Sequence, residues 1–373
     1  MNRRHLLSIV LYASALWLIV WSISPYFQID TTNYMVMMLH YAGYSYGDAC
    51  REVYTSSYAA EAFHSQEAVA RLQNEGSCTN ILRFFKSRVM YPLLASLIFR
   101  LTGSVHALGA VSMLSYTLSG VLLYRIFSYT IAERHSLYLS LIFLTLPIVV
   151  RKVGVLYLTD SLSLLMWLAC TLLYYRHLKH GKGLLPLMPL LLLYVGVRVN
   201  VFPLIFGFIV TSLMLRRYRD AKLLAAAGLL LFAALTLLMG YVNSYGLLDH
   251  YIHTFYTLGT DAFIDYERPD VGTGVLVSDY ATRLVDAFVG AVLRLCLHLN
   301  VLLLAGFLGY VCCAERVERA LFAGQVPGTL TLLVAFPYPD SRFLVYAVPA
   351  ILYFSYFGFR RITGWAKEKR KIL

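Results

Sequence analysis

The chain alternates between long apolar runs and short polar segments, and the lengths of these runs predict membrane-spanning helices. A bilayer core needs about 20 mainly apolar residues per helix. Apolar runs, some of them short or interrupted, lie at 6–24, 105–127, 136–154, 158–175, 183–200, 201–215, 223–243, 296–314, 320–337 and 343–359. The pattern predicts an all-α polytopic membrane protein with about ten transmembrane helices in one transmembrane domain, residues 1–373.

The composition agrees with this class of protein. Of the 373 residues, 59% are hydrophobic and only 14% are charged, which is too few charges to cover a soluble surface of this size. The net charge of +12 could suggest nucleic acid as a partner. The basic residues form short clusters between apolar runs instead of one patch, and that arrangement is typical of membrane topology.

The basic residues also predict the orientation. With a cytoplasmic N-terminus, ten helices return the C-terminus to the cytoplasm, in a basic tail at 360–373. The cytoplasmic segments then hold 19 of the 32 Lys and Arg residues, against five acidic residues. An excess of Lys and Arg on the cytoplasmic side is the usual rule for short loops.

Two longer segments fall on the opposite, outer side. The first, 25–104, contains helix-like stretches at 31–42 and 58–73 and ends in a short apolar piece, 88–100, which we expect to lie at the membrane interface. The second is 244–295. The acidic residues concentrate on this side while the spans hold almost no charge, so the pattern favours chemistry at the outer surface over a path through the bilayer.

Two cysteines, Cys50 and Cys78, lie in the first outer segment. If the outer side is oxidising, a disulfide between them would close this segment. The pattern alone leaves open whether the two residues are bonded or reduced.

Several short motifs occur in order at the predicted outer ends of the helices. They are Gln28-Ile-Asp-Thr-Thr-Asn-Tyr34, Phe85-Lys-Ser-Arg-Val-Met-Tyr-Pro92, Tyr157-Leu-Thr-Asp-Ser161, Arg198-Val-Asn200 and Ser341-Arg-Phe-Leu-Val-Tyr-Ala-Val-Pro349. This succession, which extends over most of the chain, resembles the GT-C superfamily of membrane glycosyltransferases. The individual motifs are degenerate, and the resemblance depends on their order and their side of the membrane.

The resemblance implies a function and two acidic site residues. The function is inverting transfer of a sugar from a polyprenyl-phosphate carrier to an acceptor hydroxyl of a glycan, lipid or protein on the non-cytoplasmic face. Asp30 matches the general base of the family, and Asp160 matches a second acid that faces the same cavity. From position alone, both could instead serve as ordinary helix-capping residues. A divalent cation, Mg²⁺ or Mn²⁺, serves some members and not others, and these two residues would hold it.

Basic residues at outer helix ends are candidates for binding the departing phosphate. Arg342 matches the arginine that precedes the last helix in the family pattern, and Arg88 and Arg198 follow it in rank. Arg151 and Lys152 are further candidates. Guanidinium groups bind phosphate through paired hydrogen bonds. The alternative for each residue is that it extends toward lipid headgroups.

Aromatic and acidic residues of the two outer segments are candidates for binding the acceptor or the sugar. We expect Tyr34, Tyr256 and Asp265 in this role, because aromatic rings and carboxylates suit sugar faces and hydroxyls. The same composition also suits a belt at the membrane interface.

Two other functions are compatible with a polytopic chain that has outer loops. One is a polysaccharide polymerase or ligase of the O-antigen type, and the other is a flippase or transporter of lipid-linked sugars. The order of the motifs favours the glycosyltransferase. The short loops favour a bacterial inner membrane, with the site facing the periplasm and a cell-envelope glycan as product.

Overall fold

The computed structural model describes residues 3–23, 28–63, 65–181, 184–243, 247–252, 255–256, 272–335, 337–338 and 340–370. The protein is all-helical, and no β-strand occurs in these ranges. The helices are α1 (Arg3–Ile23), α2 (Ile29–Ala42), α3 (Tyr46–Tyr54), α4 (Ser57–Ala62), α5 (Gln66–Leu72), α6 (Glu75–Leu82), α7 (Met90–Thr102), α8 (Ala107–Phe127), α9 (Glu133–Thr145), α10 (Pro147–Val149), the π-helical turn η1 (Val150–Gly154), α11 (Thr159–His180), α12 (Leu187–Val195), α13 (Val201–Met214), α14 (Tyr218–Asn243), α15 (Leu247–Ile252), α16 (Thr273–Cys312), α17 (Arg316–Ala335), the 3₁₀ helix η4 (Ser341–Ala347) and α18 (Val348–Arg370).

Several of these helices mark the chain as a multi-pass membrane protein. In the described ranges, four helical stretches are long and apolar enough to cross a bilayer: α1, α8, the first part of α14, and η4 with α18 up to Gly364. Two bent pairs raise the number to six. One is α9 with α10 and η1, bent by 59°, and the other is α16, bent by 93° at Leu299.

The remaining predicted runs also contain helices, but these do not meet the same criterion. α12 and α13 have only 9 and 14 residues. α11 and α17 have 22 and 20 residues, and each carries charged side chains in a terminal turn. The structure therefore supports four to six spans directly, where the hydropathy pattern predicts about ten.

Small residues allow the helices of the bundle to pack closely. α13 and α17 meet at Gly207, Gly324 and Gly328, where an added Cβ on Gly324 would lie 2.7 Å from the carbonyl oxygen of Gly207. A Cβ on Gly328 would lie 2.7 Å from the carbonyl oxygen of Pro203. Close backbone approach of this kind is a common mode of helix packing in membranes.

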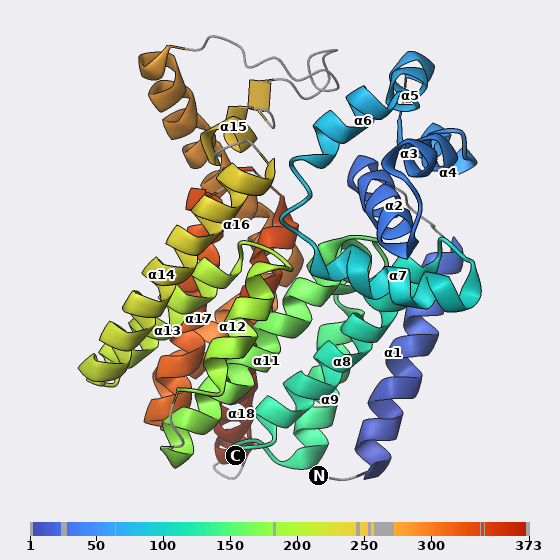
Figure 1. The fold of residues 1–373 in the computed structure, drawn as a ribbon. Helices are drawn as coiled ribbons and strands as arrows, with labels where there is room; N and C mark the ends of the chain where they lie inside the picture. Colours follow the sequence, from blue (N-terminus) through green and yellow to red (C-terminus); the bar gives the residue numbers. More distant parts are fainter. Residues whose placement is uncertain are drawn as a thin grey trace.

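A layer of short helices lies over one end of the bundle, which we call the covered end. Figure 1 shows α2–α6 above the bundle and α7 lying across the upper end of α8, and α7 contacts both α2 and α8. The stretches expected at 31–42, 58–73 and 88–100 occur here as α2, as α4 with α5, and as α7. The start of α1 and the end of α18 lie at the other end (Figure 1).

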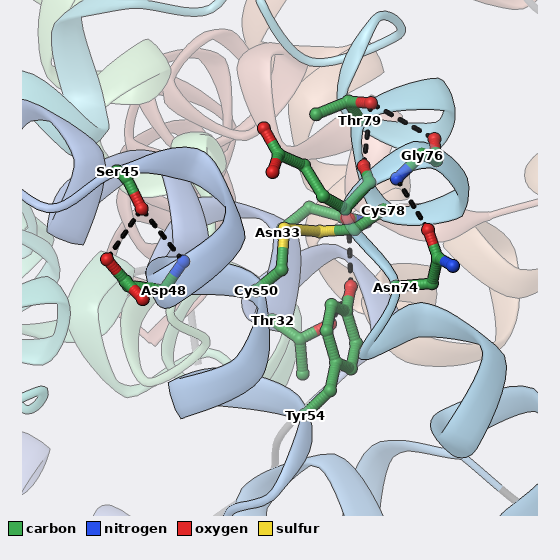
Figure 2. Close-up of a disulfide and its surroundings, with 11 residues drawn as sticks. Thr32, Asn33, Ser45, Asp48, Cys50, Tyr54, Asn74, Gly76, Cys78 and Thr79 are labelled. Atoms are coloured by element: carbon green, nitrogen blue, oxygen red, sulfur yellow. Dashed lines mark hydrogen bonds between the residues drawn. A yellow bond between two sulfur atoms is a disulfide. The ribbon is translucent and has the colours of Figure 1, made fainter.

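A disulfide closes this layer. Cys50 of α3 and Cys78 of α6, which are 28 positions apart in the sequence, are bonded, as Figure 2 shows. Tyr54, beside the disulfide, donates a hydrogen bond to Asn33 of α2 (3.2 Å) and lies 3.4 Å from the hydroxyl of Thr32. Burial raises the pKa of Tyr54 to about 12, so its hydroxyl keeps its proton and can act as donor. These contacts hold α2 against the disulfide-bonded helices.

The second outer segment and the basic tail also contain helices. In the second outer segment, 244–295, Leu247–Ile252 forms α15, and α16 covers residues from Thr273 onward; residues 257–271 lie outside the described ranges. The basic tail at 360–373 continues the last helix as far as Arg370.

Candidate functional site

An ion-paired group of side chains lies at the covered end of the bundle. Asp160, in the first turn of α11, has a side chain that is 5% exposed and forms a salt bridge with Arg198, which lies between α12 and α13. On its other side, Nη1 of Arg342 in η4 lies 4.0 Å from Oδ2 of Asp160. These residues belong to three distant parts of the sequence, and the folded bundle brings them together.

Local structure explains where two of these side chains lie. An acid in the first turn of a helix interacts favourably with the helix dipole, which suits Asp160 at the start of α11. Asp340 caps η4 by accepting a hydrogen bond from the backbone N–H of Arg342 at 2.9 Å. The same Asp340 carboxylate lies 3.2 Å from Nε of Arg342. Arg342 thus lies between two carboxylates, Asp340 and Asp160.

A third arginine joins this group from the helical layer. Nη1 of Arg88, two residues before α7, donates a hydrogen bond to the hydroxyl of Tyr34 at 2.9 Å, and the guanidinium lies 5.2 Å from the ring of Phe85. The Tyr34 hydroxyl is also 3.5 Å from that of Thr159, the neighbour of Asp160. The backbone N–H of Met90 donates to the carbonyl of Gly196 at 3.0 Å, so the turns that carry Arg88 and Arg198 touch.

Tyr34 is buried, with 1% of its surface exposed, and its ring meets Phe85 and Tyr91 edge to face, each at a centroid distance of 5.5 Å. Neighbouring rings cover the Tyr34 ring in this structure, and its predicted contact with a sugar stays a prediction. The sequence showed an aromatic residue near the site, but ring packing depends on the fold. Tyr34 connects Arg88 to the start of α11.

Asp30 lies half-buried in the first turn of α2. A capping box between Gln28 and Thr31 fixes this turn, since Gln28 N–H donates to the Thr31 hydroxyl at 3.2 Å. Within the described ranges, the Asp30 carboxylate makes no hydrogen bond or salt bridge. Its negative charge acts on Arg198, although less than that of Asp160 does, and on this ground we group Asp30 with the residues around Asp160.

The charges of this group, which we call the polar cluster, are unevenly matched. It consists of Asp30, Arg88, Asp160, Arg198, Asp340 and Arg342. Arg198 and Arg342 face the carboxylates of Asp160 and Asp340, whereas the bonded partner of Arg88 in the described structure is a neutral hydroxyl. The charges of all three arginines act on Asp160. Arg88 and Asp30 are therefore the cation and the anion that have no salt bridge within the described cluster.

A buried hydrogen-bond network supports the cluster from below. The hydroxyl of Tyr346 in η4 donates to Ser163 of α11 at 2.8 Å and accepts from the amide of Asn200 at 2.7 Å. Ser163 also lies 2.9 Å from the hydroxyl of Tyr194 in α12. The network joins the elements that carry Asp160, Arg198 and Arg342. The sequence did not predict a role for the side chains of this network. The one signal was the position of Ser163, which follows Asp160 by about one helical turn and therefore lies on the same face of α11.

Three predicted site residues do not join the cluster in the described structure. Arg151 and Lys152 lie on η1 with exposed side chains and make no described hydrogen bond or salt bridge. Tyr256 donates to Asp279 of α16 at 2.9 Å, and Asp279 forms a salt bridge with Arg283 at 2.6 Å. That is a separate group. Asp265 lies outside the described residues.

The donor set does not suit the divalent cation considered from the resemblance. Both carboxylate oxygens of Asp160 face guanidinium groups, and these positive groups would repel a metal cation. In the parts of the chain with described coordinates, no three His, Cys, Asp or Glu residues are grouped as a metal would require. The guanidinium of Arg88, whose bonded partner is a neutral hydroxyl, is the group of this cluster that could instead receive an anionic ligand.

No protein-family model matches the chain, and no curated protein or solved structure matches it.

Proposed function

We propose that the protein is a membrane glycosyltransferase that moves a sugar from a polyprenyl-phosphate carrier to an acceptor hydroxyl. The observation that carries the proposal is the pairing pattern of the polar cluster. Asp30 offers a carboxylate with no described salt bridge, and Arg88 offers a guanidinium bonded to a neutral hydroxyl. Transfer needs one group of each kind: a base for the acceptor and a cation for the departing phosphate.

The proposed reaction uses these groups in a single displacement. The carboxylate of Asp30 takes the proton of the acceptor hydroxyl while the acceptor oxygen bonds to the anomeric carbon. The bond between that carbon and the phosphate oxygen breaks, and the phosphate leaves with the electron pair. Attack opposite the leaving group inverts the anomeric configuration. Arg88, together with Arg342 and Arg198, stabilises the negative charge that the phosphate gains.

Asp160 has a positioning role in this scheme. Its carboxylate holds Arg198 and lies 4.0 Å from Arg342, so the two guanidinium groups are oriented before a ligand arrives. Such preorganised charges stabilise a developing anion without reorganising during the reaction. Tyr34 has the corresponding role for Arg88.

The proposed membrane arrangement has ten spans and both termini in the cytoplasm, and it places the covered end outside. The basic residues of the connections at the opposite end support this orientation. The Cys50–Cys78 disulfide lies in the helical layer, and disulfides persist in oxidising compartments such as the bacterial periplasm. The proposed location is a bacterial inner membrane, with the donor in the bilayer and an envelope glycan, lipid or protein as acceptor.

Asp30→Asn tests the proposal. Membranes that contain the protein are incubated with a panel of radiolabelled polyprenyl-phosphate sugars, and transfer to endogenous acceptors is measured. We expect transfer with at least one donor and a loss of roughly 10²- to 10⁴-fold in Asp30→Asn, because the base is removed. Glu61→Gln, which changes an exposed acid in α4, is the matched control and should retain activity.

Two results would contradict the proposal in different ways. Unchanged transfer by Asp30→Asn would exclude this residue as the base. Failure of the folded wild-type protein with every donor and acceptor-containing membrane tested would argue against the glycosyltransferase and in favour of a polymerase or a flippase.

A further inference from the structure

The position of the Asp30 carboxylate depends on the backbone of α2, because no described side chain bonds to it. A general base acts only when it lies about 3 Å from the proton that it takes, or one water molecule away. The backbone that carries Asp30 must therefore be held in place by other contacts. The hydrogen bonds at the start of α2 identify the side chains that hold it.

Three consecutive polar side chains at the start of α2 are fully buried: Thr31, Thr32 and Asn33. The Thr31 hydroxyl accepts a hydrogen bond from the backbone N–H of Gln28 at 3.2 Å. The Thr32 hydroxyl and the Asn33 side-chain amide both donate to the carbonyl of Ile29, at 2.8 and 3.3 Å. That carbonyl belongs to the planar peptide unit whose nitrogen is the backbone nitrogen of Asp30. The buried side chains therefore fix the backbone directly before Asp30.

Tyr54 of α3 connects this turn to the disulfide-bonded helices. Figure 2 shows Tyr54 near the Cys50–Cys78 disulfide, with its hydroxyl pointing toward Asn33 of α2. The hydroxyl donates to the side-chain oxygen of Asn33 at 3.2 Å, while the side-chain nitrogen of Asn33 donates to Ile29. Asn33 therefore uses both ends of its amide, one toward Tyr54 and one toward the peptide unit of Asp30.

Tyr54 is itself held by several parts of the helical layer. It is 1% exposed, and it follows Cys50 by about one turn of α3. Its carbonyl accepts a hydrogen bond from the side-chain amide of Gln73 at 3.3 Å, and its ring meets that of Phe63 edge to face at a centroid distance of 6.0 Å. The layer therefore determines where the Tyr54 hydroxyl lies, and this hydroxyl determines the orientation of Asn33.

We propose that Tyr54 and Asn33 are positioning residues that hold Asp30 where its carboxylate takes the proton of the acceptor hydroxyl. This inference rests on the proposed function, and it assigns a part in the reaction to two side chains outside the polar cluster. Neither side chain touches the substrate, and both act through the backbone of α2. A contact that only stabilised the helical layer would affect the protein in the same way whether or not Asp30 is present.

Tyr54→Phe tests the proposal, because it removes the hydroxyl and keeps the ring. We expect kcat to fall by roughly 10- to 100-fold, since a shift of about 1 Å in a reacting group can cost about 10²-fold. KM for the donor should stay unchanged, because Arg88 keeps its bond to Tyr34. In protein that already carries Asp30→Asn, adding Tyr54→Phe should lower the residual kcat no further, since the group that it positions is gone.

Tyr116→Phe is the matched control. It also removes a buried tyrosine hydroxyl, one that donates to the carbonyl of Leu144 at 2.6 Å between helices of the bundle. Its kcat should equal that of the wild-type protein. An unchanged kcat in Tyr54→Phe, or an equal fall with and without Asp30→Asn, would overturn the positioning role.

Hydrogen–deuterium exchange separates this inference from the proposed function, because it needs no transfer. Peptides that cover 29–36 should exchange faster in Tyr54→Phe than in the wild-type protein, while peptides of α8 and α11 stay unchanged. Faster exchange in a protein that transfers from no donor would confirm that Tyr54 holds this turn and would overturn only the glycosyltransferase. Transfer by the wild-type protein with unchanged exchange in Tyr54→Phe would overturn the positioning role and leave the proposed function in place.

Discussion

At the residue scale, Asp30 and Asp160 differ in their surroundings more than in their chemistry. Asp160 is buried and ion-paired, whereas Asp30 is half-buried and has no described hydrogen bond. Removing one partner of a buried ion pair leaves the other charge uncompensated, at a cost of about 3–5 kcal/mol. Loss of activity on changing Asp160 would therefore mix instability with chemistry, and Asp30 gives the cleaner test of the base.

The arginines also differ in their surroundings. Arg198 and Arg342 face carboxylates, whereas Arg88 is bonded to a neutral hydroxyl, so we expect a substitution of Arg88 to weaken donor binding most. We expect Arg88→Ala to raise KM for the donor by roughly tenfold or more, since a charge-assisted hydrogen bond contributes about 1.5–3 kcal/mol. Tyr34→Phe should raise KM less, because Arg88 is kept but loses the hydroxyl that orients it. Steady-state kinetics with the purified protein in nanodiscs measures both effects.

Arg151→Ala is the matched control for this prediction. It removes an exposed arginine that also lies at the end of a predicted span and makes no described bond to the cluster. Its KM should equal that of the wild-type protein. A larger change for Arg151→Ala than for Arg88→Ala would place the phosphate at η1 instead of at the cluster.

At the element scale, α11 connects the two ends of the bundle. Its first turn carries Asp160, and its last turns carry Tyr175 and Lys179, which both bond to the buried Glu318 of α17. Lys179 Nζ lies 2.6 Å from Glu318 Oε1. These polar contacts fix α11 at both ends, so the position of Asp160 is determined by the packing of the whole helix.

The disulfide of the helical layer predicts a local effect on stability. In the chain-entropy account, closing 28 residues stabilises the folded state by ~3–4 kcal/mol. Cys50→Ser, or Cys78→Ser, should therefore speed amide hydrogen exchange in α3–α6 while leaving α8 and α11 unchanged. Hydrogen–deuterium exchange with mass spectrometry measures this. Cys296→Ser, which changes an exposed free cysteine, is the control. Equal exchange in all variants would mean that packing alone holds the layer.

At the scale of the whole molecule, the orientation in the membrane is the main property to test. We expect a cysteine introduced at exposed Gln66 of α5 to react with a membrane-impermeant maleimide on intact cells, since the helical layer is proposed to lie outside. A cysteine at exposed Ala132, between α8 and α9, should react only after permeabilisation. Both variants carry serine at Cys296 and Cys312, which are exposed. The reverse labelling pattern would mean that the chain is inserted the other way.

The sequence predicted that Asp160, Arg198 and Arg342 lie on one side of the bundle, but it predicted little of how they pair. Asp160, Arg198 and Arg342 could be assigned to one side of the membrane because each lies at the same end of an apolar run. Arg151 and Lys152 satisfied the same criterion, and the structure puts them elsewhere, exposed on a π-helical turn. Hydropathy indicates depth in the membrane, but it does not indicate position around the bundle.

The sequence by itself determined the class of the protein, because hydrophobic runs are local and each one records the need to match the bilayer. It also indicated a helical layer between the first two spans. Only the tertiary structure decided that Asp160 neutralises Arg198 and that Arg88 bonds to Tyr34. These properties depend on contacts between residues that are distant in the chain, and such contacts exist only once the helices have packed.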